Sequence, residues 1–317
     1  MILLSSELVR SESVHRSFTP QLAYWWSMGI AKSPPREVNQ FYLKDVHDLT
    51  KISMVYTSLA AKGYVREYGL HTRSSADLVS LAEVGPIAKG PNDALLYCYG
   101  GNTGNIYVRL NGNTTRQLVM NDGITRPKPV AAMAWDPATS VIYAVRPRSQ
   151  KGSLELLRVP YDGTKYRTIP YPRRGTVVGV EYYDTFLYIA VNTLDGSGVV
   201  DQVQINPSLP EPLNIIYSYH TPGPISINSL GVGKVDVQPP NNVSVFVHQY
   251  GANYLSRFAQ YYSEPWYIFQ YDSQGAFLLN KNHPTFVSAT HEGVSTSKDS
   301  VFTITEKRHQ LNELYHS

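Results

Sequence analysis

Residues 130–169 read VAAMAWDPATSVIYAVRPRSQKGSLELLRVPYDGTKYRTI. This stretch contains four short segments with strand-like composition, at residues 130–135, 141–145, 152–158 and 165–169. Asp162-Gly163 precedes the last segment, and Asp-Gly favours a tight hairpin because both central residues of that turn need positive φ. The stretch therefore predicts a sheet of four antiparallel strands.

The second of these segments, an apolar strand around an aromatic residue, recurs along the chain. The aromatic markers are Tyr56, Tyr97, Tyr143, Tyr188, Phe246 and Phe302. They stand about 40 to 60 residues apart, a period typical of β-propeller blades. We therefore predict an all-β fold, a six-bladed β-propeller, with a sandwich of two large sheets as the alternative.

The propeller is predicted to be a single domain over residues 1–317. Its blades are expected at about 51–84, 85–121, 130–171, 176–218, 226–280 and 285–317. The last unit is one strand short, and residues 1–10 contain a spare apolar strand, Ile2–Val9. Pairing of these N- and C-terminal strands would close the ring and remove its free edges.

Residues 11–50 fit the repeat least well and are expected to be irregular or short-helical decoration. Thr19-Pro20 is a possible helix start, and Val38, Phe41, Tyr42 and Val46 have helical spacing. The alternative is that residues 23–29 form the innermost strand of the first blade.

One blade resembles those of the six-bladed YWTD and NHL propellers. The likeness depends on Asp136-Pro137 before the second strand and Asp162-Gly163 before the fourth. It extends in part to residues 94–120 and 176–217, but the Tyr-Trp-Thr-Asp tetrad is absent. The resemblance implies the fold and not a receptor function.

Composition excludes several classes of protein. The 317 residues have a net charge of +3, and the one cysteine, Cys98, excludes an internal disulfide and a cysteine-based zinc site. We find no nucleophile elbow, P-loop, His-Glu-x-x-His or Gly-x-Gly-x-x-Gly motif. Residues 1–10 lack a basic n-region, and no apolar run approaches the ~18 residues of a membrane helix. We therefore expect cytoplasmic synthesis, no signal peptide and no membrane span.

Propeller topology places several basic residues on one side of the disc. The loop between the second and third strands of a blade and the connector to the next blade share a side, whereas Asp136, Glu155 and Asp162 are expected on other segments. The basic residues gathered in this way are Arg126, Lys128, Arg146, Arg148, Lys151, Arg173 and Arg174. Unpaired like charges attract anions, although a solvated rim without a specific ligand is the alternative.

A second candidate surface is the aromatic excursion, residues 249–266, on the same side. Its rings are Tyr250, Tyr254, Phe258, Tyr261, Tyr262 and Trp266. Tyrosine and tryptophan supply rigid contact area at interfaces and sugar sites. The alternative is that the rings cap the local core.

These features favour a non-enzymatic binding or assembly module without cofactor, metal or catalytic residues. Its expected partners are assembly proteins or a cell-surface glycan or receptor, as in a virion surface or phage attachment protein. One alternative is a hydrolase like the propeller lactonases, which hold a channel metal; its candidate residues on inner strands are Glu181, Asp236, His291 and Glu292. Another is NHL-like RNA binding through the basic residues.

Overall fold

Strands account for every regular element that the structure describes, apart from one 3-10 turn, η1 (Pro91–Asp93). The structure is a computed structural model that describes residues 7–10, 24–32, 38–44, 51, 53–58, 62–69, 72–100, 105–110, 115–118, 128–148, 150–205, 213–220, 226–233, 244–250, 266–271, 277–281, 291–296, 300–305 and 310–316. Side chains are described in those ranges between residues 40 and 220, and at Ile227, Leu230, Gly231 and Val232. The predicted all-β class is confirmed.

Three sheets in the described part of the chain contain four antiparallel strands in chain order. The first consists of β3 (Val38–Lys44), β4 (Ser53–Ser58), β5 (Tyr64–Gly69) and β6 (Ser74–Ser80). The second consists of β7 (Val84–Lys89), β8 (Leu95–Tyr99), β9 (Ile106–Arg109) and β10 (Thr115–Leu118). The third consists of β18 (Ser226–Gly233), β19 (Ser244–Tyr250), β20 (Trp266–Tyr271) and β21 (Phe277–Lys281).

A further sheet continues through seven strands. They are β11 (Ala132–Asp136), β12 (Val141–Pro147), β13 (Ser153–Pro160), β14 (Arg167–Tyr183), β15 (Phe186–Thr193), β16 (Gly198–Gln204) and β17 (Ile215–His220). The long β14 belongs to two units, because residues 167–174 pair with β13 and residues 175–183 pair with β15. Gly175 lies between these halves with φ +151°, and a Cβ there would lie 2.0 Å from the carbonyl oxygen of Asn192. Only glycine fits this crossing without strain.

The remaining sheet joins the two ends of the described chain. Its order is β1 (Glu7–Arg10), β2 (Tyr24–Lys32), β24 (Gln310–His316), β23 (Ser300–Thr305) and β22 (His291–Thr296). The strand that pairs with β24 is therefore β2, with Trp26 opposite Tyr315. Residues 7–10 pair with the other edge of β2, so the prediction that residues 1–10 pair with the last strand is wrong.

Both residues 24–32 and residues 38–44 are strands, so the helical interpretation is wrong there. The alternative of a strand at residues 23–29 agrees with β2, but β2 lies between β1 and β24 and is not the innermost strand of the first blade. The spacing of Val38, Phe41 and Tyr42 matches a helix. An inner strand is buried on both faces, so adjacent residues can both be apolar, and the resulting pattern is similar. Phe41 and Tyr42 are adjacent, and both are partly buried. The β3–β6 sheet accordingly begins at residue 38 and not at residue 51.

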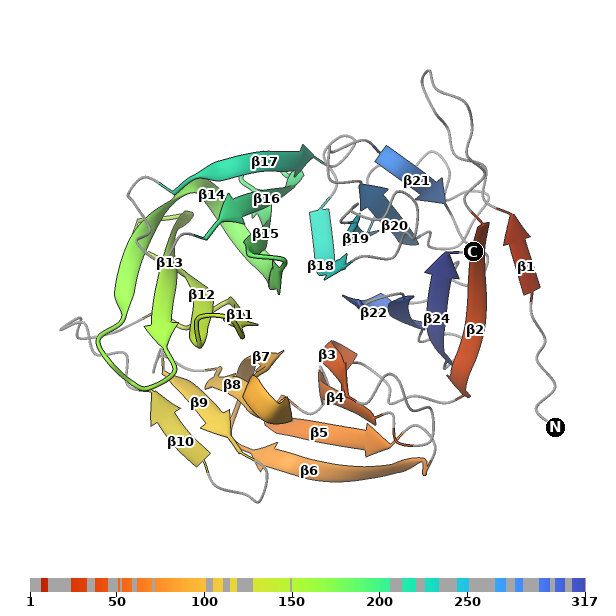
Figure 1. Cartoon of the computed structure of the whole chain (residues 1–317), viewed down its shortest axis with the longest axis horizontal. Coiled ribbons are helices and arrows are strands. Elements are labelled where there is room, and N and C mark those ends of the chain that lie inside the picture. The colour runs from red at the N-terminus through yellow and green to blue at the C-terminus, as the bar shows by residue number, and fades with distance from the viewer. Residues whose placement is uncertain are drawn as a thin grey trace.

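The first strands of the units surround the centre of the disc (Figure 1). β3 contacts β7, which contacts β11; β11 contacts β14, which contacts β18; and β18 contacts β22, which contacts β3. These contacts run around a common axis, as the inner strands of a β-propeller do. We call the sheets blades, and the two that share β14 are the β11–β14 blade and the β14–β17 blade.

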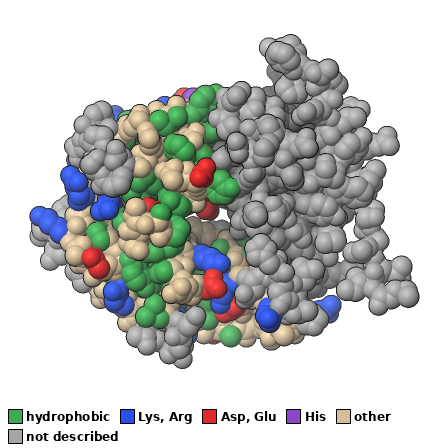
Figure 2. Space-filling model, in the orientation of Figure 1, with side chains coloured by type: hydrophobic (Ala, Val, Ile, Leu, Met, Phe, Trp, Pro, Cys, Tyr) green, Lys and Arg blue, Asp and Glu red, His purple; other side chains and the backbone are tan. Residues whose placement is uncertain are grey.

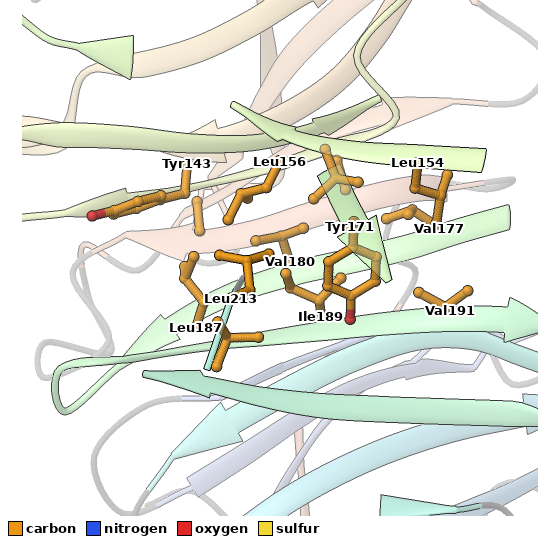
Figure 3. Packing of buried hydrophobic residues seen from close by; sticks show 14 of the residues in the cluster. Tyr143, Leu154, Leu156, Tyr171, Val177, Val180, Leu187, Ile189, Val191 and Leu213 are labelled. Atoms are coloured by element: carbon orange, nitrogen blue, oxygen red, sulfur yellow. The ribbon is translucent and has the colours of Figure 1, made fainter. Parts of the chain in front are cut away.

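The marker strands are apolar throughout because both of their faces are buried between blades. In β15, Leu187, Ile189 and Val191 pack against the β11–β14 blade (Figure 3), whereas Tyr188 and Ala190 pack toward β18. Each large apolar side chain buried in this way contributes about 1.5–3 kcal/mol. The packing explains why the aromatic markers identified the blades.

The turns of the β11–β14 blade also follow from the sequence. The Asp136 carboxylate accepts a hydrogen bond from the backbone N–H of Ala138 at 2.9 Å, which fixes the turn before β12. Gly163 has φ +82°, and its N–H donates to the carbonyl oxygen of Pro160 at 3.1 Å. The chain does turn at Asp162-Gly163, but Asp162 does not have the positive φ of the predicted two-residue hairpin turn, so that turn type is wrong; Asn111-Gly112 lies outside the described residues.

Candidate functional site

Arg146 is a buried structural residue and not part of an exposed basic rim. Its side chain is 1% exposed, and its Nε donates to Oε1 of Glu155 at 2.5 Å. Arg146 and Glu155 face each other across β12 and β13, so the expectation that Glu155 lies away from the basic residues is wrong. A buried guanidinium requires a paired carboxylate, and this need explains the arrangement.

Arg173 is also occupied within the fold. Its Nε and Nη2 each donate to the Asp201 carboxylate at 2.9 Å. The same carboxylate, which is completely buried, accepts from the Tyr171 hydroxyl and the Ser218 hydroxyl, both at 2.6 Å. These contacts join the outer part of the β11–β14 blade to β16 and β17 of the next blade, so we remove Arg173 from the predicted contact surface.

Four of the predicted basic residues remain exposed, namely Lys128, Arg148, Lys151 and Arg174. Arg174 lies opposite Ser153 at the start of β13, and the Arg148 N–H donates to the Ser153 carbonyl oxygen at 2.8 Å. The residues before β11 lie beside the end of β12, because the Ala131 N–H donates to the Val145 carbonyl oxygen at 2.8 Å. These cations therefore lie at one end of the β11–β14 blade, while Arg126 lies outside the described residues.

Leu194, which the sequence analysis missed, lies at the same end. It stands in the turn between β15 and β16 and is 65% exposed. A Cβ at Gly152 would lie 3.2 Å from the Leu194 Cδ2, so this leucine adjoins the turn that carries Arg148 and Lys151. We call Lys128, Arg148, Lys151, Arg174 and Leu194 the basic end.

The aromatic excursion starts and finishes at one place in the fold. Tyr250 ends β19, Trp266 begins β20, and the two residues are register partners. The side chains of both lie outside the described residues, as do Tyr254, Phe258, Tyr261 and Tyr262. The proposed role of these rings in contacts stays a prediction.

Glu181 is the acidic residue that the structure places on the inner half of β14. Val180 faces the β11–β14 blade, so alternation along the strand turns Glu181 toward β18. On that side Gly179 adjoins Leu230. Tyr188, the register partner of Glu181, packs in a cluster with Ile227, Leu230 and Val232. These neighbours reduce the exposure of the Glu181 side chain to water without covering it completely.

Burial raises the pKa of Glu181 to about 7. Its side chain nevertheless keeps some accessible surface, and no described side chain forms a hydrogen bond or an ion pair with it. A carboxyl group in this state exchanges a proton near neutral pH, which is the property of a general acid–base. The Asp136 carboxylate, also on an inner strand, is instead held by its own turn.

The other proposed metal ligands give no described site. Asp236 lies outside the described residues, and for His291 and Glu292 only the backbone of β22 is described. Among the residues whose placement is described, no three His, Cys, Asp or Glu side chains gather as metal ligands. Figure 2 shows acidic and basic side chains near the centre of one face of the disc, beside apolar surface.

No protein family model matches the chain. No curated protein matches it either. Solved structures do: a gluconolactonase from Xanthomonas campestris has a TM-score of 0.63 at 12% identity, over 98% of this chain and 96% of its own. A putative gluconolactonase has a TM-score of 0.61 at 9% identity, over 97% and 98% of the two chains. The β-propeller domain of Cps50 (Swd1) from Myceliophteria thermophila has a TM-score of 0.54 at 9% identity, over 89% and 98%.

Identities this low show the fold alone, and the fold is a β-propeller. In the described residues no helix has the length and apolar character to cross a bilayer.

Proposed function

We propose that this six-bladed ring, closed between its ends by β2 and β24, is a hydrolase that opens a lactone or a related ester, with Glu181 as general acid–base. The observation that carries the proposal is a carboxyl group on an inner strand whose pKa is about 7 and which no described side chain engages. The structural likeness to gluconolactonases supports the choice of substrate class.

The chemistry requires one proton to be moved twice. The Glu181 carboxylate takes a proton from water while the water oxygen bonds to the carbonyl carbon. The ring C–O bond then breaks, and the same proton passes to the leaving ring oxygen, so that lactone and water give one hydroxy acid. Glu181 returns to its starting state, and a pKa near neutrality serves both transfers.

A metal ion is part of the lactonase alternative, and the described residues do not supply a site for it. Glu181 lies on β14, but the described part of the chain holds no second and third ligand beside it. We therefore assign no step to a metal. Calcium and zinc analysis of the purified protein tests separately whether the protein binds a channel metal.

The activity test measures, in a pH-stat, the rate at which acid is released from gluconolactone and from other uncharged lactones. The protein should exceed the buffer rate, and Glu181→Gln should lower kcat by about 10²–10⁴-fold, the usual contribution of a general acid–base. Glu83→Gln is the matched control, because Glu83 is exposed in the connector between β6 and β7 and loses the same charge. No turnover above buffer, or equal rates for Glu181→Gln and wild type, would contradict the proposal.

A further inference from the structure

We propose that the basic end binds an acidic segment of a partner protein that also presents an apolar side chain. The inference does not depend on the hydrolase activity, because the basic end and Glu181 lie on different parts of the fold. It concerns an interaction surface, and its occupant is an acidic polypeptide. The proposal keeps the binding role predicted from the sequence, but it replaces the seven predicted basic residues by the five residues of the basic end.

The basic end is compact because backbone hydrogen bonds hold its turns together. The Gly175 N–H donates to the Gly152 carbonyl oxygen at 2.8 Å, which joins the β12–β13 turn to the crossing in β14. The β15–β16 turn is closed by the Thr193 N–H and the Ser197 carbonyl oxygen, also at 2.8 Å. Hydrogen-bonded turns of two adjacent blades therefore hold the backbone of Arg148, Lys151, Arg174 and Leu194 in place.

Among the residues that the structure describes, the positive charge of the basic end exceeds the acidic charge around it. Glu155 is 2.5 Å from Arg146 and 3.7 Å from Arg148, so one carboxylate faces two guanidinium groups. The exposed carboxylate of Asp195 is the acidic group in the neighbouring turn, where it accepts from the Ser197 hydroxyl at 2.7 Å. Among the described residues, this end thus has four exposed cations, of which Arg148 shares the Glu155 carboxylate with Arg146, and one exposed carboxylate, Asp195. An anionic partner would neutralise the remaining positive charge.

Leu194 gives the surface an apolar anchor. It is the most exposed large hydrophobic side chain of the described residues, at 65%. Leu194 lies directly against Gly152, where a Cβ would be only 3.2 Å from the Leu194 Cδ2. Covering Leu194 with an apolar group of a partner removes its surface from water while the cations meet the partner's carboxylates.

A polypeptide fits these residues better than a nucleic acid does. Proteins that bind single-stranded nucleic acid usually stack bases on aromatic rings. None of the five residues of the basic end is aromatic, and the exposed apolar group is an aliphatic leucine. The RNA-binding alternative therefore becomes an outcome of the test.

The opposite end of the same blade provides matched controls. β13 runs from Ser153 at the basic end to Pro160 at the other, where Lys165 and Arg167 are exposed. The double substitution Lys165→Glu/Arg167→Glu therefore changes the charge as much as Lys151→Glu/Arg174→Glu does. Leu110, 39% exposed at the end of β9, is the control for Leu194.

The experiment measures the binding of a labelled peptide of Glu and Ser residues with one central Leu by fluorescence anisotropy at low salt. The full chain should bind it saturably. Lys151→Glu/Arg174→Glu should weaken binding about tenfold or more, and Leu194→Ser about tenfold, as should replacing the peptide's Leu by Ser. The two control variants should bind like wild type, and circular dichroism should show every variant folded.

Three results would overturn the proposal. The first is no saturable binding of the acidic peptide. The second is an equal loss in Lys165→Glu/Arg167→Glu, which would mean that net charge and not the basic end determines affinity. The third is tighter binding of oligouridylate RNA than of the peptide, without any effect of Leu194→Ser.

Discussion

Asp201 and Glu181 are two carboxyl groups of the β14–β17 blade in opposite chemical situations. Asp201 on β16 is completely buried and accepts hydrogen bonds from Tyr171, Arg173 and Ser218. Glu181 on β14 keeps some exposure, has no such partner among the described residues, and has a pKa of about 7. A carboxylate whose oxygens accept hydrogen bonds from several side chains stabilises the fold. A carboxyl group without such partners among the described residues can instead exchange a proton with a substrate.

The largest expected effect comes from removing the occupied carboxylate. Asp201→Ala leaves the buried Tyr171 hydroxyl and the Arg173 guanidinium, 32% exposed, without their acceptor. Breaking a fully buried pair costs about 3–5 kcal/mol, which sets the upper end of the expected loss. Urea unfolding followed by tryptophan fluorescence measures the loss. A decrease below about 1 kcal/mol would show that Asp201 does not hold the two blades together.

A change of pH should reveal Glu181 through stability. Its pKa is raised from 4.5 to about 7, so the folded state binds the proton more tightly than the unfolded state does. The free energy of unfolding should therefore fall, by up to about 3 kcal/mol, as pH rises from the ordinary glutamate range through 7. The difference between wild type and Glu181→Gln isolates this effect from other titrating groups, and parallel curves for the two proteins would argue against the raised pKa.

The smallest expected changes in stability come from removing two tyrosine hydroxyls, those of Tyr171 and Tyr188. Tyr171→Phe removes a donor to Asp201 and should cost about 1.5–3 kcal/mol, as expected for a hydrogen bond to a charged group. The Tyr188 hydroxyl is buried and has no hydrogen-bond partner among the described residues, so Tyr188→Phe should be neutral or slightly stabilising. Denaturant midpoints of the two variants provide the check; equal losses would mean that hydrogen bonding does not distinguish them.

The fold was predictable because the marker strands are buried on both faces. Val141, Tyr143 and Val145 face one blade interface, and Ile142 and Ala144 face the other, so the run is apolar throughout. The pairing of β2 with β24 was missed because no local pattern specifies which distant segments become neighbours. The inner strand β3 was missed because its spacing also matches a helix.

The candidate sites were predictable only in part. Arg146 and Glu155 are nine residues apart on either side of the β12–β13 turn, and the hairpin register could have paired them. The pairing of Arg173 with Asp201 connects two blades and has no comparable local signal. Glu181 was proposed from its place on an inner strand, but its raised pKa depends on burial against another blade.

The most direct measurement is a titration of the glutamate side-chain carboxyl carbons by ¹³C NMR, with Glu181→Gln used to assign the signal. We predict that one carboxyl group titrates near pH 7 in the wild type and that its signal is missing from the variant. If instead the Glu181 signal titrates in the ordinary glutamate range, the proposed role of this residue in hydrolysis is wrong.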